Sequence, residues 1–217
     1  MLVGKRMSHP VITIGPETPM LEALELMHKE HIRRIPVVDK HGNLIGIITE
    51  RQLLKASPSD ATTLDVYEMR GMMEKVKIEE LMAHQVISVG EDTPIEEAAR
   101  IMADKKIGGL PVVKDNKVVG IITETDLFKI LLELTGARQP GLRVSLMIAD
   151  QPGGLSKLTK AIFDVGGDIV SLGTFMGDDS DTSEVTLKVN GVAQEKLMAA
   201  IKPFIKSIVD VRQTHLM

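Results

Sequence analysis

Apolar residues follow two kinds of spacing along the first 135 residues of the chain. Short apolar runs, which predict strands, alternate with stretches in which apolar residues recur every three or four positions, which predict helices. In the first helical stretch the residues expected on the buried face are Met20, Ala23, Leu24 and Met27. The expected strands are 11–14, 35–38 and 44–48, and we expect one helix to begin at the cap residue Thr18 and another at Thr49.

This order of elements occurs twice. The segment 7–14 returns as 82–89, the segment 35–38 as 110–113, and the segment 46–50 as 120–124. The offset between the copies shrinks by one residue, in the loop 39–43. In the second copy, Thr93 and Glu96 have the spacing of a capping box. A duplication of this kind predicts two copies of one unit about a pseudo-two-fold axis, with a cleft between them in which a small ligand would sit.

A different pattern follows the second copy. Strands are expected at 143–149, 169–176, 183–189 and 208–211, and helices at 155–165 and 192–205. The order β-α-β-β-α-β is typical of a ferredoxin-like fold. We therefore expect a fold of mixed α/β and α+β class, in which repeat 1 covers 1–60, a linker helix 61–77, repeat 2 78–137 and a C-terminal domain 142–217.

Composition narrows the possible functions. With 43% hydrophobic and 26% charged residues among 217, the chain is ordinary and globular. A net charge of −4 and only 2% aromatic residues argue against a nucleic-acid partner. The absence of Cys excludes disulfides and thiolate zinc sites. No apolar run reaches the length of a membrane span, and 1–6 lack a signal-peptide core, so we expect a cytoplasmic protein with no membrane partner.

One group of residues suggests ligand chemistry from spacing alone. In the second copy an apolar strand delivers Thr123 to a helix start, where backbone N–H groups and the hydroxyl favour an anion. Asp126 follows in the first helical turn, where its carboxylate would accept hydrogen bonds from a ribose diol. The alternative is structural: Thr123 caps the helix and Asp126 is its first-turn acid, together worth about 1 kcal/mol. Spacing alone leaves both interpretations open.

The two copies resemble a tandem pair of CBS domains, the modules named after cystathionine beta-synthase. The resemblance rests on Met-x-x-x-Val openings, Thr-Pro helix starts, Ile/Leu-Pro-Val-Val strands and Gly-Ile-Ile-Thr turns, each present twice in order. It implies an adenosine nucleotide in the cleft, either AMP, ADP, ATP or S-adenosylmethionine. The family's ligand pattern falls on Gly120, Thr123 and Asp126. By the same resemblance, the adenine edge would meet backbone at Val86, Ser88, Gly109, Leu110 and Pro111.

The first copy departs from this pattern at Gln52, which stands where the second copy has Asp126. An amide lacks the charge-assisted strength of a carboxylate. We therefore expect a weaker second nucleotide site, formed by Arg33, Arg34, Pro36 and Thr49. The two arginines align with Gly108 and Gly109 of the second copy. Either they neutralise phosphates near the axis or they are a solvated pair, while the glycines would let a base approach the backbone.

The C-terminal segment resembles an ACT domain over about 142–217. The residues that carry this resemblance are Asp150, Gly153, Gly154 and Leu155, followed by Gly166-Gly167-Asp168-Ile169. It implies an amino-acid ligand, whose carboxylate would meet the bare helix start at the glycines while Asp150 accepts from its amino group. The alternative is a strand-to-helix turn in a domain that only dimerises.

A CBS pair joined to an ACT domain resembles the acetoin-utilisation accessory proteins of the AcuB type. The resemblance implies a regulatory sensor, homodimeric, with an enzyme as a possible partner. Because we find no nucleophile, acid–base pair or metal set, we expect no catalysis, no required cofactor and no metal. The alternative function is structural, with both modules serving as dimerisation surfaces for a partner enzyme. An enzyme acting on acetoin is disfavoured.

Overall fold

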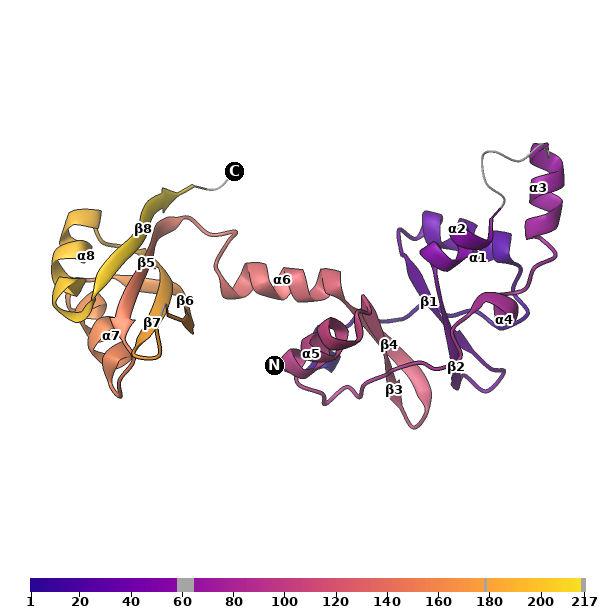
Figure 1. The fold of residues 1–217 in the computed structure, drawn as a ribbon, viewed down its shortest axis with the longest axis horizontal. Helices are drawn as coiled ribbons and strands as arrows, with labels where there is room; N and C mark the ends of the chain where they lie inside the picture. The colour runs from indigo at the N-terminus through magenta and orange to yellow at the C-terminus, as the bar shows by residue number, and fades with distance from the viewer. Residues whose placement is uncertain (58–64, 178, 216–217) are drawn as a thin grey trace. The chain divides into compact units, whose positions relative to one another are not determined.

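The computed structural model describes residues 1–57, 65–177 and 179–215, so part of the linker 61–77 lies outside the described residues. The chain divides into two compact units, unit 1 (Met1–Leu127) and unit 2 (Phe128–Met217). Figure 1 shows the elements of each.

Unit 1 contains the two copies, and each copy contributes one antiparallel hairpin and its flanking helices (Figure 1). The elements of copy 1 are α1 (Met20–Lys29), β1 (Arg34–Val38), β2 (Leu44–Thr49) and α2 (Glu50–Ala56). The elements of copy 2 are α5 (Ile95–Lys105), β3 (Gly109–Lys114), β4 (Lys117–Thr123) and the start of α6 (Glu124–Leu134). Shorter segments precede or join them: η1 (Val3–Lys5), α3 (Val66–Met73) and α4 (Ile78–Leu81). The predicted hairpin strands are therefore confirmed.

The strand expected at 11–14 is reduced to a single parallel bridge between Ile14 and Val37, and copy 2 repeats this with Val89 and Val112. The Ile14 N–H donates to the Pro36 carbonyl at 3.2 Å and the Val38 N–H donates to the Ile14 carbonyl at 2.9 Å, but Pro36 has no N–H with which to extend the ladder toward Ile12. Pro111 has the same position opposite Val89 in copy 2. The ladder therefore stops after one bridge, and the prediction of a strand was wrong.

The helices after the Thr-Pro dipeptides begin one residue later than expected. The N-cap residues are Pro19 for α1 and Pro94 for α5, whose rings offer no hydroxyl to the helix. Thr93 Oγ1 instead accepts from the Gly90 N–H at 3.1 Å, so the capping box expected from Thr93 and Glu96 does not form. The threonine closes the preceding turn rather than the helix.

Each copy completes its core with the segment that precedes the other copy. Val3 and Met7 pack among the core residues of copy 2, which include Met102. Ile78 and Met82 pack in the core of copy 1. Backbone hydrogen bonds repeat the exchange, from the Val3 N–H to Thr93 O at 2.9 Å and from the Ile78 N–H to Thr18 O at 3.0 Å. The two copies are therefore joined by reciprocal exchange as well as by surface contact.

The turns of the two hairpins also meet. Asn43 and Lys117 form an antiparallel bridge, and the Leu44 N–H donates to the Asn116 carbonyl at 3.2 Å. The copy 1 turn contains Asp39, which accepts from the side chain and the N–H of Asn43, both at 2.9 Å. The shorter copy 2 turn uses positive φ at Asp115 and Asn116. The residue lost between the copies therefore changes the type of turn but not the pairing.

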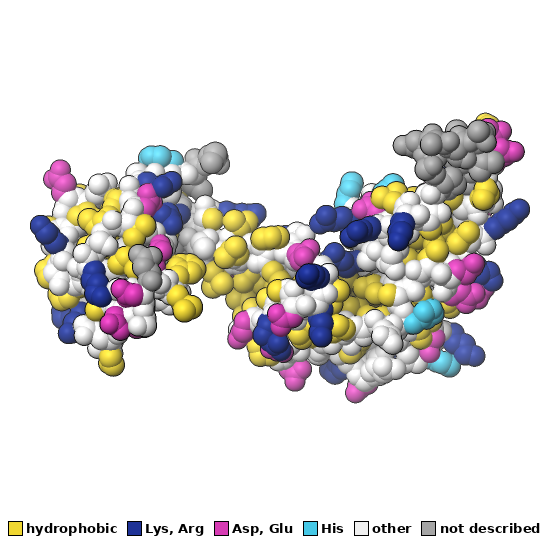
Figure 2. All heavy atoms as spheres, viewed as in Figure 1, with side chains coloured by type: hydrophobic (Ala, Val, Ile, Leu, Met, Phe, Trp, Pro, Cys, Tyr) yellow, Lys and Arg dark blue, Asp and Glu magenta, His cyan; other side chains and the backbone are white. Residues whose placement is uncertain are grey.

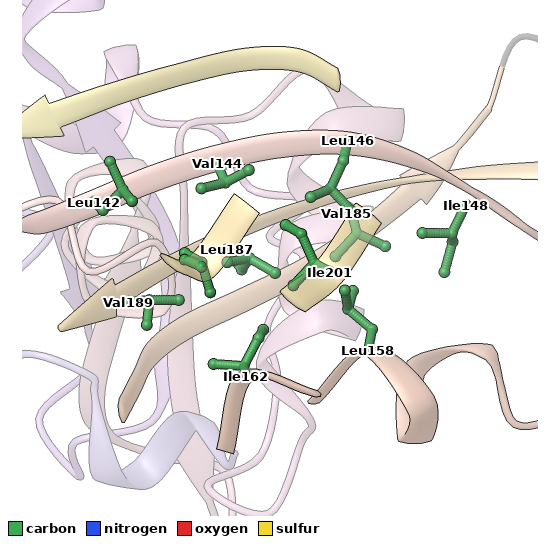
Figure 3. Packing of buried hydrophobic residues seen from close by; sticks show 11 residues of the cluster. Leu142, Val144, Leu146, Ile148, Leu158, Ile162, Val185, Leu187, Val189 and Ile201 are labelled. Carbon is green, nitrogen blue, oxygen red and sulfur yellow. The ribbon is translucent and has the colours of Figure 1, made fainter. Parts of the chain in front are cut away.

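Unit 2 shows the predicted alternation of strands and helices. Its elements are β5 (Gly141–Ala149), α7 (Gly154–Asp164), β6 (Asp168–Met176), β7 (Thr182–Asn190), α8 (Gln194–Ile201), η2 (Lys202–Phe204) and β8 (Ser207–Thr214). The described strands form an antiparallel sheet in the order β6-β7-β5-β8. In Figure 3 alternate residues of β5, such as Leu142, Val144 and Leu146, share one core with Leu158 and Ile162 of α7. This alternation is the period of a strand with one buried face.

A charged side chain is buried in unit 2. Lys188 of β7 is 4% exposed, and its Nζ donates to the carbonyl oxygens of Gly136 at 2.7 Å and Gln139 at 2.8 Å. Gly136 has a φ of +58°, which a residue with a Cβ rarely adopts. The hydrogen bonds compensate the cost of burying the ammonium group, and they fix the turn after α6 to the sheet.

In the described part of the chain, no helix is both long enough and apolar enough to cross a bilayer.

Candidate ligand-binding site

A cavity of about 660 Å³ opens between the two copies of unit 1. Ligand pockets for small molecules measure about 300–1,000 Å³. Copy 1 contributes the end of β2 and the start of α2, while copy 2 contributes its approach segment 83–87, the end of α5 and the start of β3. The lining residues are Arg33, Arg34, Ile47, Thr49, Glu50, Arg51, Gln52, Ala83, Gln85, Val86, Ile87, Lys106, Ile107, Gly108, Gly109 and Pro111.

Gln52 organises the start of α2 on the copy 1 side. Its Oε1 accepts from the Thr49 N–H at 3.0 Å and from the Thr49 hydroxyl at 2.6 Å. Its Nε2 donates to the Leu81 carbonyl at 3.1 Å, so the amide also attaches α2 to α4. Both ends of the amide are therefore engaged, and the start of the helix is held rigidly beside the cavity.

Asp126 repeats this arrangement at the start of α6. Its Oδ2 accepts from the Thr123 N–H at 2.9 Å and from the Thr123 hydroxyl at 2.7 Å. The carboxylate is 7% exposed and therefore lies inside the fold rather than in bulk water. The hydroxyl and the acid proposed to hold a ribose and a phosphate thus contact each other, as the structural alternative expects.

Arg34 reaches from copy 1 onto the glycine pair of copy 2. Its Nη1 donates to the Gly108 carbonyl. A Cβ on Gly108 would collide with the Arg34 guanidinium and with Glu124, and a Cβ on Gly109 would come within 2.9 Å of Arg34 Cδ. The glycines therefore make room for an arginine. Burial lowers the pKa of the Arg34 guanidinium, against an opposing effect of Glu124 and with a smaller lowering from Arg33.

The charge of the cavity lining is unbalanced. Among the described residues that line it, the cations are Arg33, Arg34, Arg51 and Lys106, whereas the acid is Glu50. Glu50 Oε1 lies 3.4 Å from His28 Nε2. Figure 2 shows Lys and Arg side chains gathering on unit 1 beside α2. Such a lining favours an anionic ligand.

The cavity brings together residues that the sequence analysis divided between two sites. Val86, Gly109 and Pro111 were grouped with Thr123, but they line one cavity with Arg33, Arg34 and Thr49. The reason is the pairing between the copies. A bridge between Ala83 and Ile47 places the approach segment of copy 2 beside the Thr49 helix start, and a bridge between Ser8 and Ile121 places the approach segment of copy 1 beside Thr123.

Other predicted site residues lie elsewhere. Leu110 is fully buried in the core of copy 2, and Pro36 is also buried. Ser88 is half-buried and, like these two, does not belong to the described lining. A Cβ on Gly120 would overlap Met7 Sδ, and a Cβ on Gly46 would overlap Met82 Sδ. The glycine of the repeated pattern therefore admits the opening methionine of the other copy.

Several lining residues were not selected from the sequence. Among them, Arg51 and Lys106 carry isolated charges in no recognised motif, and Gln85 precedes Val86, which was selected. In the repeat, Lys106 aligns with His31. Both residues follow a helix and have positive φ, +53° for His31 and +54° for Lys106.

The predicted amino-acid site in unit 2 is only partly assembled around a cavity. Gly153 is the N-cap of α7 with a φ of +83°, and Gly154 lines a cavity of about 430 Å³ with Lys157 and Lys206. Asp150 is exposed, and its N–H donates to Asp181 O at 2.9 Å. Leu155 is 38% exposed. Among the described residues, no cluster of three or more His, Asp and Glu side chains is placed to hold a metal ion.

Comparison with known sequences gives matches to the same repeats. The family model for the CBS domain matches residues 3–59 and again 78–133, together more than half of the chain. A CBS domain-containing protein of Dictyostelium discoideum is 33% identical over 135 residues, which are 62% of this chain and 93% of that protein. L-aspartate semialdehyde sulfurtransferase of Methanocaldococcus jannaschii is 35% identical over 130 residues, 59% of this chain, but the match spans 23% of the enzyme.

Solved structures of CBS domain pairs are also similar to this chain. The CBS domain pair of protein MJ0100, in complex with 5′-methylthioadenosine and S-adenosyl-L-methionine, is 34% identical over 60% of this chain and 95% of its own, with a TM-score of 0.51. A putative acetoin utilization protein (AcuB) from Vibrio cholerae is 32% identical over 64% of this chain and 98% of its own, with a TM-score of 0.52. CBSX2 in complex with AMP is 26% identical over 60% and 96%, with a TM-score of 0.52. The chain therefore belongs to the CBS-domain family, as the family match to both repeats shows.

Proposed function

We propose that the chain is a non-catalytic regulatory sensor that binds an adenosine nucleotide between its two CBS repeats. The observation that carries the proposal is the cavity of about 660 Å³, because both copies line it. A ligand held by both copies binds best to one arrangement of the pair and shifts the population toward that arrangement. The relatives solved with AMP and with S-adenosyl-L-methionine support an adenosine compound as the ligand.

The lining offers a separate environment for each part of a nucleotide. Ile47, Val86 and Ile87 provide an apolar wall for the base, near the backbone of Gly109. The arginines and Lys106 provide partners for phosphate oxygens. Thr123 and Asp126 mark a second candidate position, related to the first by the pseudo-two-fold axis. We place the principal site at Thr49, because the cavity is lined there by residues from both predicted sites.

The position of the ligand can be tested with two substitutions at residues that correspond to each other in the repeat. Val86→Trp fills the cavity beside Thr49, and Val11→Trp fills the equivalent position beside Thr123. Calorimetry on the full chain with adenosine, AMP, ADP, ATP and S-adenosylmethionine should show binding that Val86→Trp weakens about tenfold or more, the loss of about 1.4 kcal/mol of contact energy.

Val11→Trp is the matched control and should leave the affinity within twofold. If Val11→Trp abolishes binding and Val86→Trp does not, the Thr123 position is the site. If none of the five compounds binds the wild-type chain, the sensor proposal fails.

For unit 2 we propose an ACT domain that forms a homodimer and takes an amino acid. The strand order β6-β7-β5-β8, with α7 and α8 packed through one core, is that of a ferredoxin-like fold, which supports the assignment. Sedimentation of the full chain at graded concentrations tests the dimer, and a panel of amino acids in thermal unfolding tests the ligand. A chain that sediments as a monomer at all concentrations would refute the dimer.

A scaffold for an enzyme is the second candidate function. It is favoured by apolar side chains that α6 leaves exposed, such as Phe128 at 64% and Leu134 at 63%. Thermal unfolding distinguishes the two functions, because a nucleotide at one hundred times its Kd should stabilise a sensor by about 2.7 kcal/mol and a scaffold not at all. We also propose a role in acetoin utilisation, which the similarity to the Vibrio cholerae protein supports, and a cytoplasmic location.

A further inference from the structure

We infer that the cavity at Thr49 selects adenosine ligands that carry two or three phosphates over uncharged or cationic adenosine compounds. The inference rests on the proposed function and specifies its ligand class. It does not follow from the net charge of the chain, which is −4. It follows from where the cations of unit 1 are placed.

The cations reach the cavity from separate segments. Arg33 and Arg34 precede or begin β1, Arg51 lies in the first turn of α2, and Lys106 follows α5 in the other copy. Glu50 is the acid among the described lining residues, and His28 lies within 3.4 Å of its carboxylate. A ligand in this cavity is therefore surrounded by positive groups from both copies, which a chain of phosphates can neutralise together.

The start of the equivalent helix in the other copy differs in charge. Thr125 stands in place of Arg51, and Asp126 in place of Gln52. The start of α6 carries the acids Glu124 and Asp126, whereas the start of α2 carries the acid Glu50 with Arg51 and the neutral Gln52. Because the two helix starts differ in charge, we expect a polyphosphate to prefer the position at Thr49.

Arg34 is already positioned for such a ligand. Its guanidinium is half-buried on Gly108, with one nitrogen donating to the Gly108 carbonyl. A guanidinium has five N–H donors in a planar fork that matches phosphate oxygens, and a backbone carbonyl is a weaker partner than a phosphate. Exchange of the carbonyl for a phosphate oxygen would recover energy that burial has cost.

The charge of the ligand distinguishes the candidate compounds. Adenosine and 5′-methylthioadenosine are uncharged, S-adenosylmethionine carries a cationic sulfonium, and AMP, ADP and ATP carry increasing negative charge. If the cations act together, affinity should rise with each phosphate and should fall with added salt, because salt screens these charges. If the cavity reads only the nucleoside, all these compounds should bind alike.

The test compares two double variants that remove the same charge from different places. Arg33→Ala/Arg51→Ala removes two cations that line the cavity, and Lys29→Ala/Lys55→Ala removes two exposed cations from α1 and α2 outside the described lining. Binding of adenosine and of ATP is measured by calorimetry on the full chain in EDTA, so that no metal neutralises the phosphates. Circular dichroism and thermal unfolding of each variant establish that it is folded.

We expect the wild-type chain to bind ATP at least about tenfold more tightly than adenosine, since each charge-assisted hydrogen bond to phosphate is roughly twice as strong as a neutral one. Arg33→Ala/Arg51→Ala should reduce this ratio toward one while adenosine affinity stays within threefold, and the lysine variant should keep the ratio. Equal affinities in the wild-type chain, or equal loss in both variants, would overturn the inference and leave the proposed function in place. No binding of either compound would overturn both.

Discussion

The two copies of the CBS repeat share a hydrogen-bonding plan and differ in charge. Oxygen atoms of Gln52 and of Asp126 each accept from the N–H and the hydroxyl of a threonine three residues earlier. One acceptor is neutral and lines a cavity with Arg33, Arg34 and Arg51, whereas the other is a buried acid. The comparison shows that the geometry of a helix start is preserved separately from the charge that surrounds it.

The same contrast explains the two aligned dipeptides. Arg33-Arg34 and Gly108-Gly109 occupy equivalent positions, and the larger side chain of one copy fills the space that the other leaves. A symmetric pair with arginine at all four positions would bring like charges together at the axis. The arginines of one copy therefore pack at the axis because the other copy carries glycines there.

The prediction with the largest expected effect concerns whether each copy needs the segment that precedes the other copy. Ile78 is fully buried in the core of copy 1, although it precedes copy 2. Ile78→Ala should lower the free energy of unfolding by about 2–5 kcal/mol because it leaves a cavity. Hydrogen exchange should locate the lost protection in α1, β1 and β2. Leu54→Ala, on an exposed side chain, is the control, and lost protection confined to copy 2 would contradict the exchange.

A second prediction concerns the glycine that faces a methionine in each copy. Gly120→Ala should cost about 1–3 kcal/mol of stability because the new Cβ overlaps Met7 Sδ. Combining it with Met7→Ala should show a coupling of about 0.5–3 kcal/mol in urea unfolding. Gly15→Ala is a matched control, since nothing lies within 4 Å of the Cβ that it adds. Strictly additive losses would show that the two residues do not contact.

A third prediction concerns a variant in which the start of α2 in copy 1 carries an acid, as the start of α6 does in copy 2. Gln52→Glu keeps an acceptor for Thr49 but loses the hydrogen bond to the Leu81 carbonyl, so the free energy of unfolding should fall by about 1 kcal/mol. The new carboxylate should also weaken ATP binding and leave adenosine binding unchanged. Asp126→Asn is the reciprocal variant, and it should leave ATP binding unchanged. An Asp126→Asn variant with lost ATP affinity would assign the nucleotide to the other position.

The smallest effect lies in the hairpin turns, where the copies differ in length. Two hydrogen bonds from Asn43 hold the pKa of Asp39 below its ordinary value. The bond from the Asn43 side chain has the larger effect, and the bond from the Asn43 N–H the smaller. The ionised form of Asp39 therefore stabilises the turn. This contribution to the free energy of unfolding is complete above the pKa that Asp39 has in the unfolded chain, and it is lost as the pH falls through the lower pKa of the folded chain. The Asn43 amide signal in NMR should shift with that low midpoint, and Asp39→Asn should abolish the transition. A midpoint at the ordinary value would contradict the hydrogen bonds.

Much of unit 1 is predictable from sequence because its hairpins are local. The apolar runs at 35–38 and 44–48, separated by a polar turn, specify one hairpin, and their repeat specifies the other. The match of the CBS family to both copies confirms the resemblance drawn from these motifs. The order of elements in unit 2 follows from the same kind of pattern.

The residues that line the cavity are harder to predict from the sequence, because contacts between the two copies determine which residues lie there. Sequence alignment places Val86 in copy 2 and therefore near Thr123, but pairing of Ala83 with Ile47 carries the segment across to Thr49. Arg51 and Lys106 face the same cavity from different copies, and no spacing along the chain reports this. The helix starts show a related limit, since Pro19 and Pro94 are N-caps where a threonine was expected.

The reciprocal placement of Val3 and Ile78 sets an order of events during synthesis. Copy 1 lacks part of its interior until Ile78 has left the ribosome, so it cannot mature as soon as its own residues are translated. Val3 precedes the first copy but packs against Met102 and Ile122, so it is buried only after those residues of the second copy have been made. Neither core is therefore complete until most of the second copy has been translated, and a nascent chain stopped between the copies leaves apolar surface for chaperones to cover.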